Sequence, residues 1–121
     1  MLPTKLSMKI ININDTTSII EINGEITAFT ENILMEAYNQ VNQRELHFLI
    51  LDFNHLDYMN SSGIGLLITL LIRANRQGQK IFAIGLNEHY QRIFELTRLN
   101  EAIKGLPTVE MAIAAVEAVN Q

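Results

Sequence analysis

The sequence predicts an α/β fold in which a mixed, mostly parallel sheet of four to five strands packs against about four helices. Short β-branched runs alternate with longer helical patterns, and residues 46–51 form an almost continuous apolar run. Such alternation is typical of parallel sheets, and such runs are typical of their central strands. With 121 residues, 48% of them hydrophobic, we expect one domain over residues 8–121 after a flexible lead-in over residues 1–7.

The first two elements read as a hairpin. Residues 8–13 alternate between two faces, and residues 15–17 are typical of a turn. Residues 18–22 are rich in β-branched side chains and predict the second strand. Gly24 should end that strand or bulge it.

A helix and a central strand follow. Thr30 is a candidate N-cap, with Glu31 placed where the helix dipole favours an acid. Apolar residues then recur at helical spacing as far as Val41. The run over residues 46–51 is broken only by His47, which we therefore place in the strand. We place His55 in the turn that follows.

The second half predicts further alternation. Asn60 begins a helical pattern that reaches about Gln77, and Gly78 is a natural stop. Asn87 can cap a third helix that turns Tyr90 and Phe94 inward. The remaining elements are a strand over residues 80–84, a short strand over residues 103–106 and a final helix opened by Pro107 and Thr108.

The turn before residue 64 carries the most chemistry. Asn60, Ser61, Ser62 and Gly63 stand where a buried strand gives way to a helix. Backbone N–H groups at a helix start are unpaired, and a phosphate on a serine there meets a favourable dipole. Simple helix capping by Asn and Ser is the alternative interpretation, and the residues alone leave both open.

Several other classes of function are disfavoured. The serines lack the glycine that precedes the nucleophile in a nucleophile elbow, and the spacing of His47, His55 and His89 brings no base toward them. The histidines also lack metal-ligand spacing, and there is no cysteine. The net charge of −4 disfavours general binding to nucleic acid or anionic lipid. We expect no cofactor and no metal.

Asp52 supports a competing hypothesis. It ends an apolar strand, as the phosphoacceptor of response-regulator receiver domains does. Those receivers also need an acidic pair near the first strand for Mg²⁺, and only Asp15 is nearby. The Lys-Pro pair expected after the last strand is missing, since Lys104 and Pro107 are separated. A structural carboxylate that accepts turn N–H groups is the simpler interpretation.

The helix after the serines is apolar on two sides. One face carries Ile64, Leu67, Ile68 and Leu71, while Leu66 and Leu70 fall on roughly the opposite face, flanking Arg73. Such a helix is either fully covered or presents an apolar contact surface. We predict that Leu66 and Leu70 belong to such a surface.

The sequence resembles the STAS domain family, and within it the stand-alone bacterial anti-sigma factor antagonists. The resemblance covers about residues 8–118. Its core is Met59-Asn60-Ser61-Ser62-Gly63-Ile64-Gly65, which is similar to the family's apolar-Asp-Ser-Ser/Thr-Gly-Leu/Ile-Gly. Supporting matches are Gly24-Glu25-Ile26, Leu49-Ile50-Leu51-Asp52 and Ile93-Phe94-Glu95-Leu96-Thr97-Arg98-Leu99.

The resemblance implies a cytoplasmic switch protein rather than an enzyme. In the family, the unphosphorylated antagonist binds an anti-sigma factor that is also a serine kinase, and the sigma factor is released. The kinase phosphorylates the first serine of the motif, which is Ser61 here, and a serine phosphatase reverses the step. The implied partner-binding residues are Asn60, Ser61, Ser62, Gly63 and Gly65, to which we add Leu66, Leu70 and Arg73.

Two departures from the family pattern stand out. Asn60 replaces the family's aspartate, which keeps the capping ability but removes a charge beside Ser61. Arg98 replaces a frequent glycine, so we expect an effect on a helix end only. The resemblance also allows a second function, in which a STAS subunit that is never phosphorylated serves a signalling scaffold or a lipid-transport complex. Neither function implies binding to nucleic acid or insertion in a membrane.

Overall fold

The computed structural model describes residues 6–119 of the chain. Within them it contains five strands, four α-helices and two short 3-10 helices. In chain order these are β1 (Leu6–Asn12), β2 (Thr17–Ile26), η1 (Ala28–Thr30), α1 (Glu31–Asn42), β3 (Phe48–Met59), α2 (Ser61–Arg76), β4 (Lys80–Ile84), α3 (Glu88–Leu96), η2 (Leu99–Glu101), β5 (Ile103–Leu106) and α4 (Val109–Val119).

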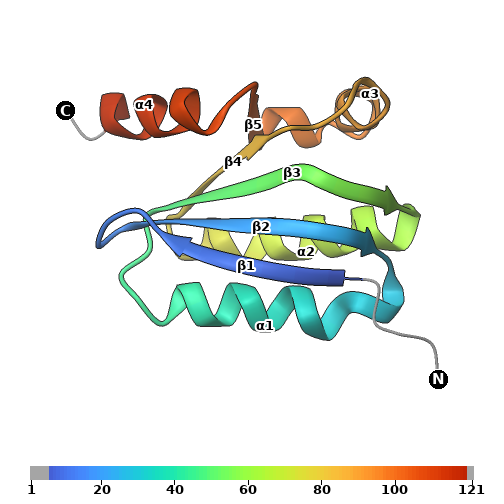
Figure 1. The fold of residues 1–121 in the computed structure, drawn as a ribbon, viewed down its shortest axis with the longest axis horizontal. Helices are drawn as coiled ribbons and strands as arrows, with labels where there is room; N and C mark the ends of the chain where they lie inside the picture. Colours follow the sequence, from blue (N-terminus) through green and yellow to red (C-terminus); the bar gives the residue numbers. More distant parts are fainter. Residues whose placement is uncertain (1–5, 120–121) are drawn as a thin grey trace.

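The strands form one sheet in the order β1-β2-β3-β4-β5. β1 pairs antiparallel with β2, and the other three pairings are parallel. The three parallel connections run through α1, α2 and α3, and α4 follows the last strand. Helices α1 and α2 lie on one side of the sheet and α4 lies on the other (Figure 1). The predicted fold class, a mixed and mostly parallel sheet with about four helices, is confirmed.

Apolar side chains on the two faces of the sheet form separate clusters. Leu49 of β3 packs in the larger cluster with Leu67 of α2, whereas Ile50 packs in the smaller one with Val116 of α4. Successive strand residues point to opposite faces, so a strand covered on both sides must be apolar at every position. This coverage explains the continuous apolar run that the sequence shows.

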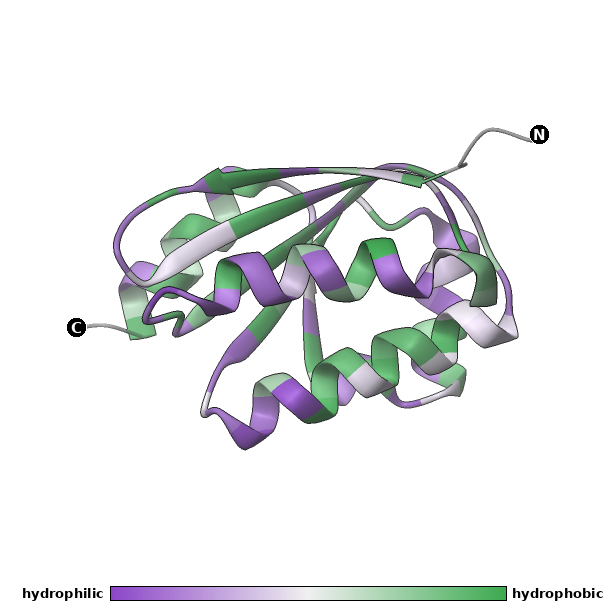
Figure 2. Cartoon of the chain, turned by 90° about the horizontal axis from the view of Figure 1, so that it is seen from below, coloured by the Kyte–Doolittle hydropathy of each residue, from purple (hydrophilic) through white to green (hydrophobic). Residues whose placement is uncertain are grey.

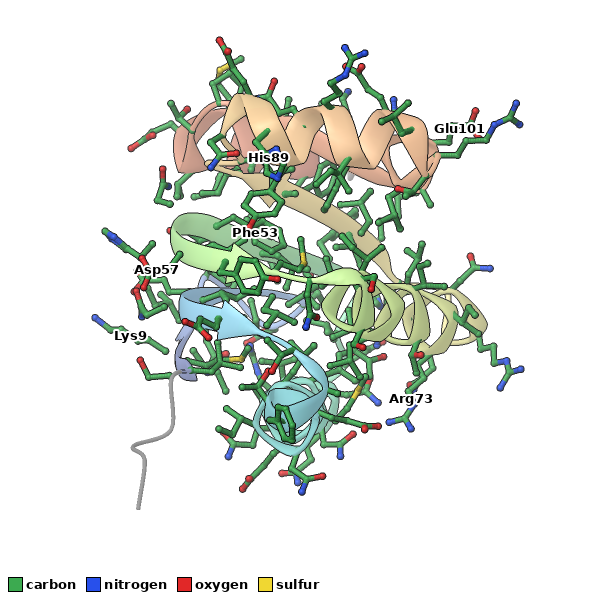
Figure 3. The ribbon with its side chains drawn as sticks, turned by 90° about the vertical axis from the view of Figure 1, so that its right-hand side faces the viewer. Lys9, Phe53, Asp57, Arg73, His89 and Glu101 are labelled. Carbon is green, nitrogen blue, oxygen red and sulfur yellow. The ribbon has the colours of Figure 1, made fainter. Side chains whose placement is uncertain are left out.

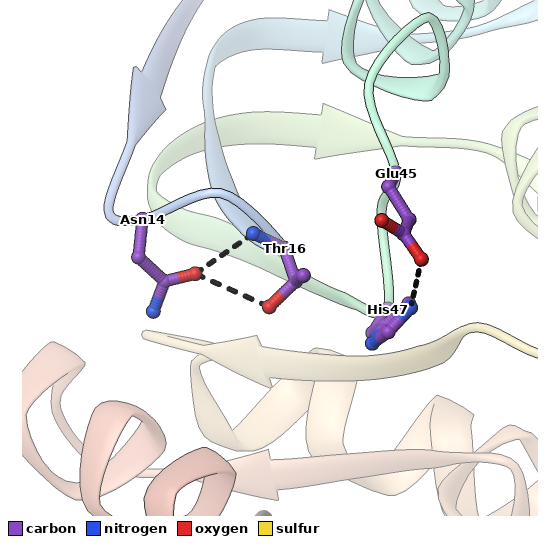
Figure 4. Close-up of polar contacts among 4 residues, drawn as sticks. All are labelled: Asn14, Thr16, Glu45 and His47. Atoms are coloured by element: carbon purple, nitrogen blue, oxygen red, sulfur yellow. Dashed lines mark hydrogen bonds and ion pairs between the residues drawn. The ribbon is translucent and has the colours of Figure 1, made fainter.

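The hairpin at the start of the sheet is confirmed. In its turn the side-chain oxygen Oδ1 of Asn14 accepts hydrogen bonds from the amide and hydroxyl of Thr16, at 2.9 and 3.3 Å (Figure 4). β1 begins at Leu6, which is buried, so the domain starts two residues before the predicted boundary. Residues 1–5 of the predicted lead-in lie outside the described residues. Gly24 has φ 113° and stands at a register shift between β2 and β3, so the predicted bulge is confirmed.

β3 differs most from the prediction. It runs to Met59, through residues whose polar character suggested a turn. Its second half pairs only with β2 and carries His55, which we expected in a turn. His47 lies just before β3 rather than within it, and its exposed imidazole is 3.5 Å from Glu45 (Figure 4). The extension matters because it delivers the chain directly to the start of α2.

Two helix ends also correct the sequence analysis. Thr30 precedes α1 but makes no side-chain cap. Its hydroxyl instead accepts a hydrogen bond from the amide of Thr27, which caps η1. After α3, Arg98 adopts φ 62°, a left-handed conformation that favours glycine. Arg98 therefore lies at the end of a helix, at a position that glycine would favour.

Candidate functional site

The turn between β3 and α2 is fixed by a helix cap. Asn60 accepts a hydrogen bond from the backbone amide of Gly63 through Oδ1, at 2.9 Å. This satisfies one of the unpaired N–H groups at the start of α2 and confirms the predicted capping role. Asn60 itself is half-buried.

Ser61 and Ser62 form the first two positions of α2. Both side chains are exposed, and neither hydroxyl makes a hydrogen bond to any other residue in the described part of the chain. The backbone amides at these positions have no acceptor within the helix. A phosphate added to either serine would meet the positive end of the helix dipole and open solvent, without disturbing the core.

Gly63 holds the helix start against the sheet. A Cβ atom at this position would lie 2.2 Å from the carbonyl oxygen of Ile26, at the end of β2. Only glycine permits that approach, so the predicted tight backbone geometry is confirmed. Because Gly63 is buried, it sets the backbone geometry of the turn but offers no exposed surface to a partner.

Tyr90 adds a support that the sequence analysis missed. Its hydroxyl accepts a hydrogen bond from the backbone amide of Met59 at 2.8 Å. The ring is 5% exposed and lies beside His89 of α3, with the ring centres 4.9 Å apart. The periodicity of α3 correctly turns Tyr90 inward, but no local pattern indicates a bond across 31 residues. The chain is thus held on both sides of the cap, at Met59 and at Gly63.

The expectation that Leu66 and Leu70 form an outer face of α2 is wrong. Leu66 is 9% exposed and Leu70 is fully buried, and both belong to the larger core cluster. The exposed apolar residues of this helix are Ile68, at 39%, and Ile72, at 48%. Figure 2 shows that hydrophobic residues occupy most of the length of α2, so its covered and its exposed sides both carry apolar residues.

Arg73 lies far from the two serines. It is exposed and points outward near the C-terminal end of α2 (Figure 3). Arg73 lies twelve residue positions beyond Ser61 along the helix, which is about 18 Å along the axis. Its guanidinium lies 3.8 Å from the sulfur of Met35 in α1.

Arg73 also affects a buried tyrosine of α1. Burial raises the pKa of the Tyr38 hydroxyl, and the nearby charge of Arg73 opposes that shift.

Asp52 has a structural environment. It is 8% exposed and accepts hydrogen bonds from the backbone amide and the side-chain nitrogen of Asn54, at 2.9 and 2.8 Å. Among residues 6–119 no three His, Cys, Asp or Glu side chains gather as a metal site would require. The receiver hypothesis therefore gains no support, and the local carboxylate interpretation is confirmed.

The surroundings of the two serines differ from those of an activated nucleophile. No described histidine or carboxylate hydrogen-bonds to Ser61 or Ser62, so neither hydroxyl has the base that a nucleophile needs. Across residues 6–119, no helix combines the length and the apolar character needed to cross a membrane. What the site offers is two free hydroxyls on a rigidly held helix start.

Comparison with known proteins agrees with this geometry. The family model for the STAS domain matches residues 8–112. The chain belongs to the STAS domain family. A protein named anti-sigma-B factor antagonist from Staphylococcus epidermidis is 26% identical over 82 residues, which is 68% of this chain and 76% of that protein.

Solved structures share the fold of this STAS domain. The anti-sigma factor antagonist SpoIIAA in its unphosphorylated form superposes with a TM-score of 0.77 at 18% identity, over 93% of this chain and 97% of that one. The Bacillus cell fate determinant SpoIIAA in the phosphorylated form gives a TM-score of 0.71 at 21% identity, over 91% and 99%. At these identities the likeness concerns the fold alone.

Proposed function

We propose that this STAS domain is an anti-sigma factor antagonist that is switched by phosphorylation at Ser61. In the unphosphorylated state it binds an anti-sigma factor with serine kinase activity, in a bacterial cytoplasm, and frees a sigma factor. Phosphorylation of Ser61 dissolves the complex, and a serine phosphatase restores it. The observation that carries the proposal is the pair of exposed, unbonded serines on the anchored start of α2.

The names of relatives support the choice of partner. A relative with 26% identity is named an anti-sigma-B factor antagonist, and a protein of the same fold has a structure in a phosphorylated form. The physical effect also fits a switch. A phosphate adds a charge of about −1.5 to −2 to a neutral turn, so a partner surface matched to the free hydroxyl would face an unpaired, poorly solvated dianion.

A second function is favoured by one specific observation. Asn60 stands where the family has aspartate, so the charge that would help to position a kinase's Mg-ATP is missing. Asparagine still caps α2, so docking can persist without transfer. The domain would then act as a constitutive interaction subunit of a signalling scaffold or a lipid-transport complex.

The release of a sigma factor tests the first function. A purified complex of anti-sigma factor and sigma factor, from the organism that makes this chain, is mixed with wild-type protein and analysed by size-exclusion chromatography. We expect free sigma factor with wild-type protein and with Ser7→Asp, a matched control at an exposed position of β1. Ser61→Asp should release much less. If wild-type protein releases none, the antagonist function is wrong. Binding without any phosphorylation would favour the constitutive subunit.

A further inference from the structure

Phe29 is the most exposed of the large hydrophobic residues in the described chain, at 98%. It stands on η1, whose backbone is held by reciprocal hydrogen bonds. The amide of Phe29 donates to the hydroxyl of Thr27 at 3.2 Å, and the amide of Thr27 donates to the hydroxyl of Thr30 at 2.9 Å. The ring is therefore presented to solvent from a fixed base, which lowers the entropy that a partner must remove on binding.

η1 lies beside the start of α2. Ile26, which ends β2 just before η1, is the residue whose carbonyl approaches Gly63, and η1 itself contacts α2. Figure 1 shows the start of α1 and the start of α2 at the same end of the molecule. Phe29 and Ser61 thus belong to one region of the surface.

An exposed stripe of α2 begins at Ser61. Gly65, Ile68 and Ile72 follow it at spacings of four, seven and eleven residues, and all four are exposed. At about 100° per residue these positions lie within an arc of about 60°. After Ser61 the stripe carries no polar side chain, which is unusual for the outer side of a helix in a single domain.

Gly65 has no explanation within the chain. A Cβ atom there would meet nothing within 4 Å, whereas a Cβ on Gly63 would strike the backbone of Ile26. A glycine inside a helix is destabilising relative to alanine. A position that needs no glycine for folding, yet lies between Ser61 and the exposed Ile68 on the same face, allows a partner to approach the helix backbone closely.

We propose that Phe29, Gly65, Ile68 and Ile72 form one docking surface, with Ser61 at its edge, and that its occupant is the anti-sigma factor. Phe29 enters an apolar pocket of that protein, and an element of the same protein lies across Gly65. This inference rests on the proposed function. We infer the anti-sigma factor as the occupant because its kinase activity must reach the hydroxyl of Ser61. That hydroxyl lies on the same face of α2 as the rest of the stripe. A second copy of this chain seated there would cover Ser61.

Binding of the purified anti-sigma factor by isothermal titration calorimetry tests the surface. Phe29→Ala should weaken binding by about tenfold or more, as buried aromatic anchors do. Gly65→Ala should also weaken it while raising the melting temperature, because alanine favours the helix and fills space that the partner needs. The matched control is Leu96→Ala on α3, which removes another large, 73% exposed side chain and should change the affinity less than twofold.

The outcomes separate this inference from the function on which it rests. If wild-type protein binds and Phe29→Ala and Gly65→Ala bind equally well, the docking surface is wrong while the antagonist function stands. If wild-type protein does not bind, both are wrong. Sedimentation velocity tests whether a second copy of this chain binds the surface instead. If wild-type protein is a dimer and Phe29→Ala is a monomer, the surface belongs to a second copy and the proposal is wrong.

Discussion

The two faces of α2 are both apolar, yet they differ in what they touch. On the inner face, Gly63 and Leu70 fill space that the sheet leaves for them. On the outer face, Gly65 and Ile72 meet no comparable neighbour: a Cβ at Gly65 finds open space, and Ile72 is 48% exposed. The same residue types thus support the fold on one side and remain available for contact on the other. The residue types alone do not distinguish these two roles. The contacts do, because Gly63 lies against the carbonyl of Ile26 and Leu70 lies in the larger core cluster.

The largest expected effect comes from the leucine and isoleucine pair. Leu70→Ala removes a fully buried side chain and should lower the free energy of unfolding by about 2–5 kcal/mol. Ile72→Ala should change it by about 0.5 kcal/mol or less, because half of that side chain is already in water. Urea denaturation of both variants measures the difference. Equal losses would mean that the two faces are not distinct.

The glycine pair sharpens the same comparison, with opposite signs. Gly63→Ala forces a methyl group against the Ile26 carbonyl and should destabilise the domain by about 1–3 kcal/mol. Gly65→Ala meets nothing and should stabilise it by about 0.5–1 kcal/mol. Thermal and urea unfolding followed by circular dichroism give both values. A destabilising Gly65→Ala would show that this glycine serves the fold after all.

The smallest expected effect on stability is that of Asn60→Asp at the cap of α2, compared here with Asn60→Ala. Asn60→Ala removes the acceptor of the Gly63 amide and should cost about 1 kcal/mol. Asn60→Asp keeps a hydrogen-bond acceptor and should change the free energy of unfolding by a few tenths of a kcal/mol. It also places the carboxylate of the family pattern beside Ser61. With the cognate kinase and ATP, we expect Asn60→Asp to be phosphorylated faster than wild-type protein, with little change in affinity. Equal initial rates would show that Asn60 does not limit the transfer.

Much of the fold could be predicted because local signals and packing agree. β4 and β5 occupy the residues that the apolar runs indicate, and Asn60 and Asn87 cap their helices as the sequence suggests. β3 was predicted too short because its second half is polar, at Asn54, His55 and Asp57. Pairing with β2, a contact distant in sequence, keeps that segment extended.

The candidate site was predicted only in part. Its cap and its serines follow from residue types, but Leu66 and Leu70 were wrongly assigned to an outer face of α2. Leu66 and Ile68 differ little in hydrophobicity, so periodicity along α2 cannot decide which of them faces the sheet. The exposure of Phe29 was not predicted either, because no sequence pattern indicates that an aromatic ring is fully exposed.

The central claim is that Ser61 controls access to the outer face of α2. Its most direct test compares the affinity of the purified anti-sigma factor for unphosphorylated protein and for protein phosphorylated by that factor, with the site identified by phosphopeptide mapping. We predict phosphate at Ser61, none in Ser61→Ala, and at least about a tenfold loss of affinity on phosphorylation, equivalent to about 1.4 kcal/mol. Phosphate at Ser62 alone, or an affinity that phosphorylation leaves unchanged, would contradict the account.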